Sequence, residues 1–152
     1  MIKIVAVGKI KDKHLKTLIA DYRERISHFH NIVIAEIADV AADKDTEYNK
    51  NVESAELLRQ IKKEDYVVLL DLQGKNPDSP TLAAKLADWN MRYPTLVFVI
   101  GGSNGVSEEV KKRADFSWQL SNLTFPHQLA RLIVLEQLYR SYKIINNQAY
   151  HK

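Results

Sequence analysis

The sequence predicts an α/β domain in which a mainly parallel sheet is flanked by helices. Short β-branched apolar runs alternate along the chain with segments of helical periodicity, and parallel strands need such crossover helices. Two of the runs, 66–70 and 95–100, are almost continuously apolar, which is typical of strands covered on both faces. The length of 152 residues fits one compact domain, so we expect a single unit spanning 1–152.

The elements follow from periodicity and from residues that start or stop them. We expect strands at 2–7, 32–37, 66–70, 95–100 and 116–120, and helices at 12–29, 43–62, 79–91, from 107, and from 124–126 to 145. Ser79 and Ser107 are expected to cap their helices, and Pro80 suits a first helical position. The segments 73–77 and 101–105 are predicted to be loops.

Composition narrows the class of protein. There are 22 Lys and Arg against 19 Asp and Glu, a mild excess of +3 that permits a polyanionic partner without requiring one. The absence of cysteine excludes disulfides and cysteine-ligated zinc, and His28 and His30 are too few for a metal site, so we expect no metal. No apolar run approaches the roughly 20 residues that span a bilayer, so we expect a soluble, cytoplasmic protein without membrane contact.

Three loops are expected to share one edge of the sheet, because ligands of parallel sheets bind outside the carboxyl ends of the strands. They are 70–75, 101–105 and 120–125. The glycines of 101–105 let backbone groups approach a nucleoside, although a plain turn is an equal alternative. The spacing matches neither a dinucleotide fingerprint nor a phosphate-binding P-loop. In 120–125, Leu123 and Phe125 would form an apolar wall; the alternative is ordinary helix entry, capped by Thr124.

The last helix is apolar on nearly every side, which predicts burial on every side. The sheet of so small a domain covers only one side, so a partner subunit is the simplest cover for the other. Glu136 and Arg140 are four residues apart and are expected to pair, either at a dimer interface or in a site. Arg131 has no partner on its own helix, which favours a functional or anionic partner.

The chain ends with Tyr150, His151 and Lys152. Terminal residues are usually frayed. The alternative is that this tail closes over a base, with Tyr150 stacking on it and Lys152 near phosphate.

Taken together, these segments resemble a known family. Leu-Asp-Leu-Gln-Gly-Lys at 70–75, Phe-Val-Ile-Gly-Gly-Ser-Asn-Gly at 98–105, Leu-Thr-Phe-Pro-His-Gln at 123–128, Glu-Gln-Leu-Tyr-Arg at 136–140 and Ala-Tyr-His-Lys at 149–152 are similar to the ribosomal large-subunit methyltransferase H family. These are small SPOUT-class enzymes that methylate the N3 position of a pseudouridine in large-subunit (23S) ribosomal RNA. The resemblance covers nearly the whole chain and is weakest at 41–51.

The resemblance implies a SPOUT-type sheet with a C-terminal trefoil knot and S-adenosylmethionine as cofactor. Its cofactor contacts correspond here to Leu70, Gly101, Gly102, Leu120, Ser121, Asn122, Leu123, Thr124 and Phe125. It also implies a homodimer in which the tail of one subunit reaches the other's site, with the acceptor base surrounded by His127, Arg131, Arg140, Tyr150 and His151. We expect the assembled ribosome as substrate. The competing interpretation is a non-catalytic nucleotide-sensing α/β module; a dehydrogenase is disfavoured because GxGxxG is absent.

Overall fold

Five parallel strands form one sheet at the centre of the molecule. The computed structural model describes residues 1–40 and 45–150. The strands are β1 (Ile2–Val7), β2 (Ile32–Ile37), β3 (Tyr66–Lys75), β4 (Leu96–Ile100) and β5 (Phe116–Trp118). Their order is β2-β1-β4-β3-β5, and every neighbouring pair is parallel. The predicted α/β fold with a parallel sheet is therefore confirmed.

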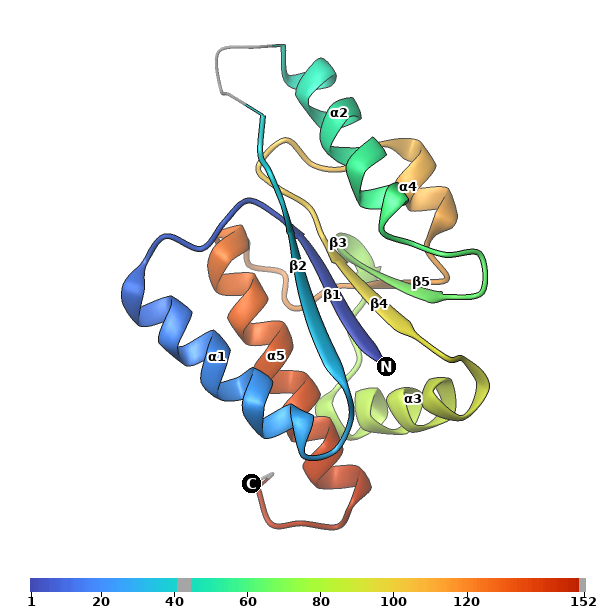
Figure 1. Cartoon of the computed structure of the whole chain (residues 1–152). Coiled ribbons are helices and arrows are strands. Elements are labelled where there is room, and N and C mark those ends of the chain that lie inside the picture. The colour runs from blue at the N-terminus through green and yellow to red at the C-terminus, as the bar shows by residue number, and fades with distance from the viewer. Residues whose placement is uncertain (41–44, 151–152) are drawn as a thin grey trace.

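Helices cover both faces of this sheet, as Figure 1 shows. They are α1 (Lys13–Ser27), α2 (Thr46–Arg59), α3 (Ser79–Arg92), α4 (Glu108–Arg113) and α5 (His127–Ile145). One buried cluster joins the sheet to α1, α3 and α5, and a second joins the opposite face to α2 and α4. β4 is buried along its whole length because it lies between β1 and β3 and is covered from both faces.

Some boundaries differ from the prediction, and the contacts of β3 and α3 explain two of these differences. β3 continues to Lys75 instead of ending at residue 70, because a register shift lets Lys75 pair with Trp118 of β5. Asp78, rather than Ser79, caps α3 by accepting a hydrogen bond from the Thr81 N–H. Ser107 does cap α4, as predicted.

The entry to α5 also corrects a prediction. The residue before the helix is Pro126, and no side chain caps the first turn, so Thr124 is not the cap. The helix itself ends at Ile145, where periodicity placed its end. α5 packs against both α1 and α3, which cover more of its surface than the sheet alone would. Leu129, 40% exposed, remains on its open side.

The parallel strands place the carboxyl ends of β1, β3 and β4 at one edge, together with the loops that follow them (Figure 1). The last described residues, which follow the end of α5, lie at the opposite edge. The trefoil knot implied by the resemblance stays a prediction.

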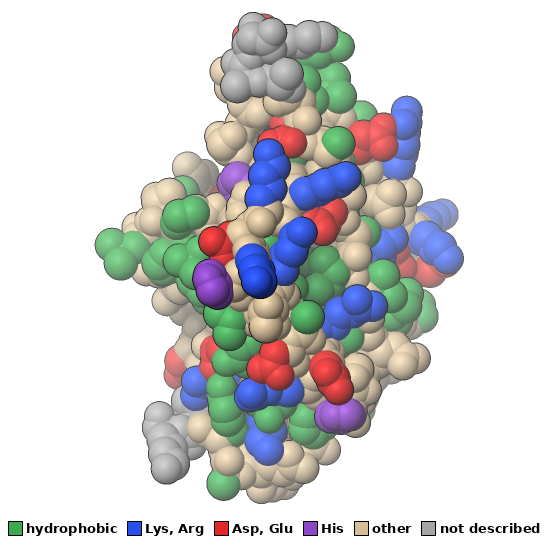
Figure 2. Space-filling model, turned by 60° about the vertical axis from the view of Figure 1, so that its left-hand side comes forward, with side chains coloured by type: hydrophobic (Ala, Val, Ile, Leu, Met, Phe, Trp, Pro, Cys, Tyr) green, Lys and Arg blue, Asp and Glu red, His purple; other side chains and the backbone are tan. Residues whose placement is uncertain are grey.

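Figure 2 shows one face of the molecule, on which Lys and Arg side chains gather over the middle with Asp and Glu side chains between them. Hydrophobic side chains gather along its left-hand edge. Within residues 1–40 and 45–150, no helix is long and apolar enough to cross a membrane. The same residues contain no group of three or more His, Asp or Glu side chains arranged to hold a metal ion.

Candidate functional site

A cavity of about 520 Å³ opens at the carboxyl edge of the sheet, where the three predicted loops meet. Its size lies within the usual range for a small-molecule site, roughly 300–1,000 Å³. Of the residues implied to contact a cofactor, those that line it are Leu70, Gly101, Gly102, Leu120, Ser121, Leu123, Thr124 and Phe125. Asn122 does not line it; its side-chain oxygen accepts a hydrogen bond from Gln119 at 3.1 Å.

The extension of β3 builds one wall of this cavity. Gly74 approaches β5 so closely that an added Cβ would lie 2.5 Å from the carbonyl of Ser117, and only glycine fits there. Gln119, just beyond β5, donates its side-chain N–H to the Leu72 carbonyl at 2.8 Å, and its backbone N–H to the Lys75 carbonyl at 2.7 Å. These bonds fix the end of β3 against the start of the 120–125 loop.

The glycine loop after β4 forms a second wall. An added Cβ at Gly101 would lie 2.8 Å from Val106, and one at Gly102 would lie 2.9 Å from Val7, so this backbone is packed tightly on both sides. Gly105 has a φ of +78° and donates its N–H to the Gly102 carbonyl at 3.1 Å. The loop is a tight turn, and its three glycines line the cavity with backbone alone.

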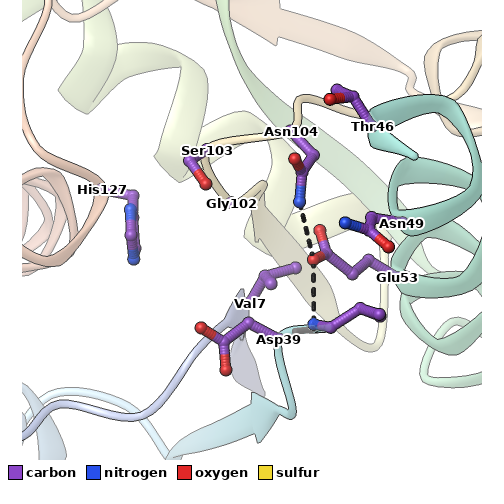
Figure 3. A pocket seen from close by; sticks show the side chains of 10 residues that line it. Val7, Asp39, Thr46, Asn49, Glu53, Gly102, Ser103, Asn104 and His127 are labelled. Carbon is purple, nitrogen blue, oxygen red and sulfur yellow. Dashed lines mark hydrogen bonds between the residues drawn. The ribbon is translucent and has the colours of Figure 1, made fainter. Parts of the chain in front are cut away.

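His127 begins α5 and lines both this cavity and a smaller one of about 230 Å³ behind the glycine loop. Figure 3 shows the smaller cavity, with His127 and Asp39 on one side and Glu53, Asn49 and Asn104 on the other. His127 is therefore the one implied acceptor-site residue that lies at the main cavity within the described part of a single chain.

Arg131 lies one turn further along α5 and is 1% exposed. Its guanidinium donates to Glu36 at 3.1 Å and to the Gly8 carbonyl at 2.9 Å. Burial lowers the pKa of Arg131, and the Glu36 carboxylate opposes that shift. Arg131 thus ties α5 to the ends of β1 and β2, where a positioning role fits better than contact with a substrate.

Arg140 and Tyr150 lie at the other end of α5. Arg140 donates to Glu136 at 2.6 Å, as its spacing predicted, and its guanidinium carbon lies 4.8 Å from the centre of the Tyr150 ring. The Tyr150 hydroxyl donates to Glu136 at 3.2 Å. Burial, and then the neighbouring Tyr22 and Glu136, raise the pKa of Tyr150 to about 12. His151 and Lys152 lie outside the described residues.

These two groups are separated within one chain. Arg140 follows His127 by thirteen positions along α5, which corresponds to about 20 Å along the axis. The structure therefore brings His127 together with the implied cofactor residues and keeps Arg140 and Tyr150 away from them.

Sequence reasoning missed three polar residues that shape this edge: Glu36, Glu53 and Gln119. Glu53 and Asn49 are both buried and are four residues apart on α2, so a polar stripe at helical spacing was the available signal. Gln119 and Glu36 gave no comparable signal, because their partners are distant in the sequence.

Comparison with known proteins supports the predicted family. The family model described as "Predicted SPOUT methyltransferase" matches residues 1–151. The chain is 45% identical to ribosomal RNA large subunit methyltransferase H of Desulfitobacterium hafniense, with 99% of this chain and 98% of the relative covered. It is 43% identical to the proteins of the same name from Clostridioides difficile and Acetivibrio thermocellus, with 99% of both chains covered in each case. The chain belongs to the SPOUT methyltransferase family, as its sequence motifs and the cavity at the carboxyl edge of its sheet led us to expect.

Proposed function

We propose that this protein transfers a methyl group from S-adenosylmethionine to the N3 position of a pseudouridine in large-subunit (23S) ribosomal RNA. The observation that carries the proposal is the main cavity, in which three sequence-distant loops with family-like motifs converge. The names of the relatives at 43–45% identity support ribosomal RNA as the substrate class. An enzyme acting on ribosomes is expected to work in the cytoplasm.

The residues of the main cavity fit the chemistry of this cofactor. Leu70, Ile100 and Phe125 provide apolar surface for an adenine ring, and the glycine loop offers peptide groups to its edge. When bound, the cofactor supplies an electrophilic methyl group and its leaving group. The protein's part is to align the acceptor with that methyl, which accounts for roughly 7–11 kcal/mol of the barrier in well-oriented reactions.

The acceptor nitrogen must lose a proton, and the side chains divide this work. His127 lies at the cavity and is our candidate for removing the proton, directly or through water. Arg140 is our candidate for stabilising the anion of the base. Tyr150, with a pKa raised to about 12, keeps its proton at neutral pH and therefore stacks or donates a hydrogen bond instead of acting as a base.

The separation of these residues within one chain supports a shared site in a homodimer. Arg140 and Tyr150 are too far along α5 to reach their own chain's cavity, whereas a second copy could present them there. The half-buried outer side of α5, with Leu129 exposed, is the surface we assign to that contact.

The first experiment tests the reaction. Purified protein is incubated with methyl-labelled S-adenosylmethionine and ribosomes from cells that lack this gene, and the RNA is digested and analysed by mass spectrometry. We expect label on one pseudouridine of the large subunit, with intact ribosomes modified faster than naked RNA. Cofactor bound without any label in RNA would instead favour the nucleotide-sensing module.

The second experiment tests the shared site. One variant, Gly101→Leu, fills the cavity, and another ends at Ala149; each is expected to be inactive alone. After the two are unfolded, mixed and refolded together, heterodimers contain one intact cavity facing one intact tail. About a quarter of wild-type activity should return, since half of the dimers carry one working site of two. No recovery would show that each chain completes its own site.

A further inference from the structure

A buried carboxylate lies directly behind the glycine loop. Glu53 projects from α2 and is 1% exposed. One of its oxygens accepts hydrogen bonds from the Asn104 side chain at 3.1 Å and from the Val40 backbone N–H at 3.3 Å, as the dashed lines in Figure 3 show. Its other oxygen has no hydrogen-bond partner among the described residues.

The next residue of α2 holds the far end of the same loop. The Ser54 hydroxyl, also 1% exposed, accepts a hydrogen bond from the Ser107 backbone N–H at 2.9 Å. Nearer the start of the loop, an added Cβ at Gly102 would lie 3.4 Å from Glu53. Consecutive residues of α2 therefore bind the second half of the loop and the residue that caps α4, and Glu53 also lies close to the backbone of Gly102.

The burial of Glu53 indicates a role in activity, because it adds little to the stability of the fold. A buried carboxylate with one oxygen unpartnered among the described residues is costly, and an apolar residue of similar size is often at least as stable. Its cost is offset if the carboxylate fixes something that activity needs. Asn104 and Gly102 line both the main cavity and the smaller one, so the loop that Glu53 holds is part of the wall between them.

We infer that Glu53 is a positioning residue for cofactor binding, acting through Asn104 to hold the glycine loop in its binding shape. This inference rests on the proposed function. Loss of either partner frees the loop, so binding must then order it and the affinity falls. The reaction itself, once the cofactor is bound, is expected to change little.

The test measures cofactor affinity by calorimetry for Glu53→Ala, Asn104→Ala and the double variant. Each single variant should weaken S-adenosylmethionine binding about tenfold. The double variant should bind no more weakly than the weaker of the two single variants, because both changes remove the same hydrogen bond between Glu53 and Asn104. KM for the cofactor should rise in step, whereas kcat at saturating cofactor stays within about threefold. Backbone amides of the loop at 102–105 should exchange hydrogen faster in both single variants.

Two controls separate positioning from folding. Glu53→Gln keeps an oxygen acceptor in place and should bind within about threefold of the wild type. Glu56→Ala removes an exposed partner of Arg59 from the same helix and should change nothing. If folded Glu53→Ala and Asn104→Ala bind as tightly as the wild type, or if their losses add to about a hundredfold, the inference is wrong. Failure of the wild type to bind the cofactor would instead overturn the proposed function.

Discussion

Replacing Arg131 by Met is expected to lower the free energy of unfolding by about 3 kcal/mol. The change removes the donors to the carbonyl of Gly8 at 2.9 Å and to Glu36 at 3.1 Å. Charge-assisted hydrogen bonds of this kind contribute roughly 1.5–3 kcal/mol each. The variant recovers part of this loss, because it no longer has to bury a cation away from water. In the variant, Glu36 would still accept the hydrogen bond from the Ile10 N–H at 2.9 Å, so its carboxylate would keep one partner.

The measurement is urea unfolding followed by circular dichroism, at one fixed protein concentration because association would shift the result. A loss of about 3 kcal/mol corresponds to a melting temperature lower by about 6–12 °C in a chain of this size. Arg131→Lys should lower the free energy of unfolding by less than Arg131→Met does, because an ammonium keeps the charge but lacks the planar set of donors of a guanidinium. Arg92→Met, which breaks an exposed pair with Asp88, is the control and should cost under about 1 kcal/mol. A loss below about 1 kcal/mol in Arg131→Met would refute the reasoning.

Two further changes test the packing. Gly74→Ala should cost about 1–3 kcal/mol in thermal unfolding, because its Cβ would lie 2.5 Å from backbone of β5; a melting temperature equal to the wild type would contradict this. Burial raises the pKa of Tyr142 to about 12, above its unfolded value of 10. The stability that its neutral hydroxyl contributes is therefore full below pH 10 and is lost between pH 10 and 12, by about 3 kcal/mol. Tyr142→Phe should therefore flatten the alkaline fall in stability; an unchanged slope would count against it.

Much of the fold could be predicted from the sequence, because most elements carry a local signal of their own. The apolar run of β4 and the Ser107 cap of α4 needed no tertiary information. The extension of β3 to Lys75 could not be predicted without tertiary information. Its residues have the composition of a loop, and they form a strand because Lys75 pairs with Trp118. Tertiary contacts outweigh local propensity at that point.

The candidate site divides in the same way. Its loops were predictable because the carboxyl ends of parallel strands must meet at one edge. The partner of Arg131 was not, because Glu36 lies 95 residues away on β2 and no helical spacing connects them. Glu53 was missed for the related reason that its polar stripe on α2 resembles an ordinary solvated face until Asn104 is placed beside it.

The proposed shared site predicts that activity depends on association, because Tyr150 lies beside Glu136 and Arg140, away from its own chain's cavity. In an isologous dimer the same patch of each subunit meets its copy, so a contact through α5 that places one tail over the partner's cavity places the other tail reciprocally. Two equivalent sites then form or dissolve together. Methyl transfer per chain should therefore fall on dilution below the dimer's dissociation constant. Cofactor binding should fall less, because the cavity proposed to hold the cofactor is lined by residues of one chain. Turnover per chain that stays constant down to concentrations where light scattering shows only monomers would contradict the shared site.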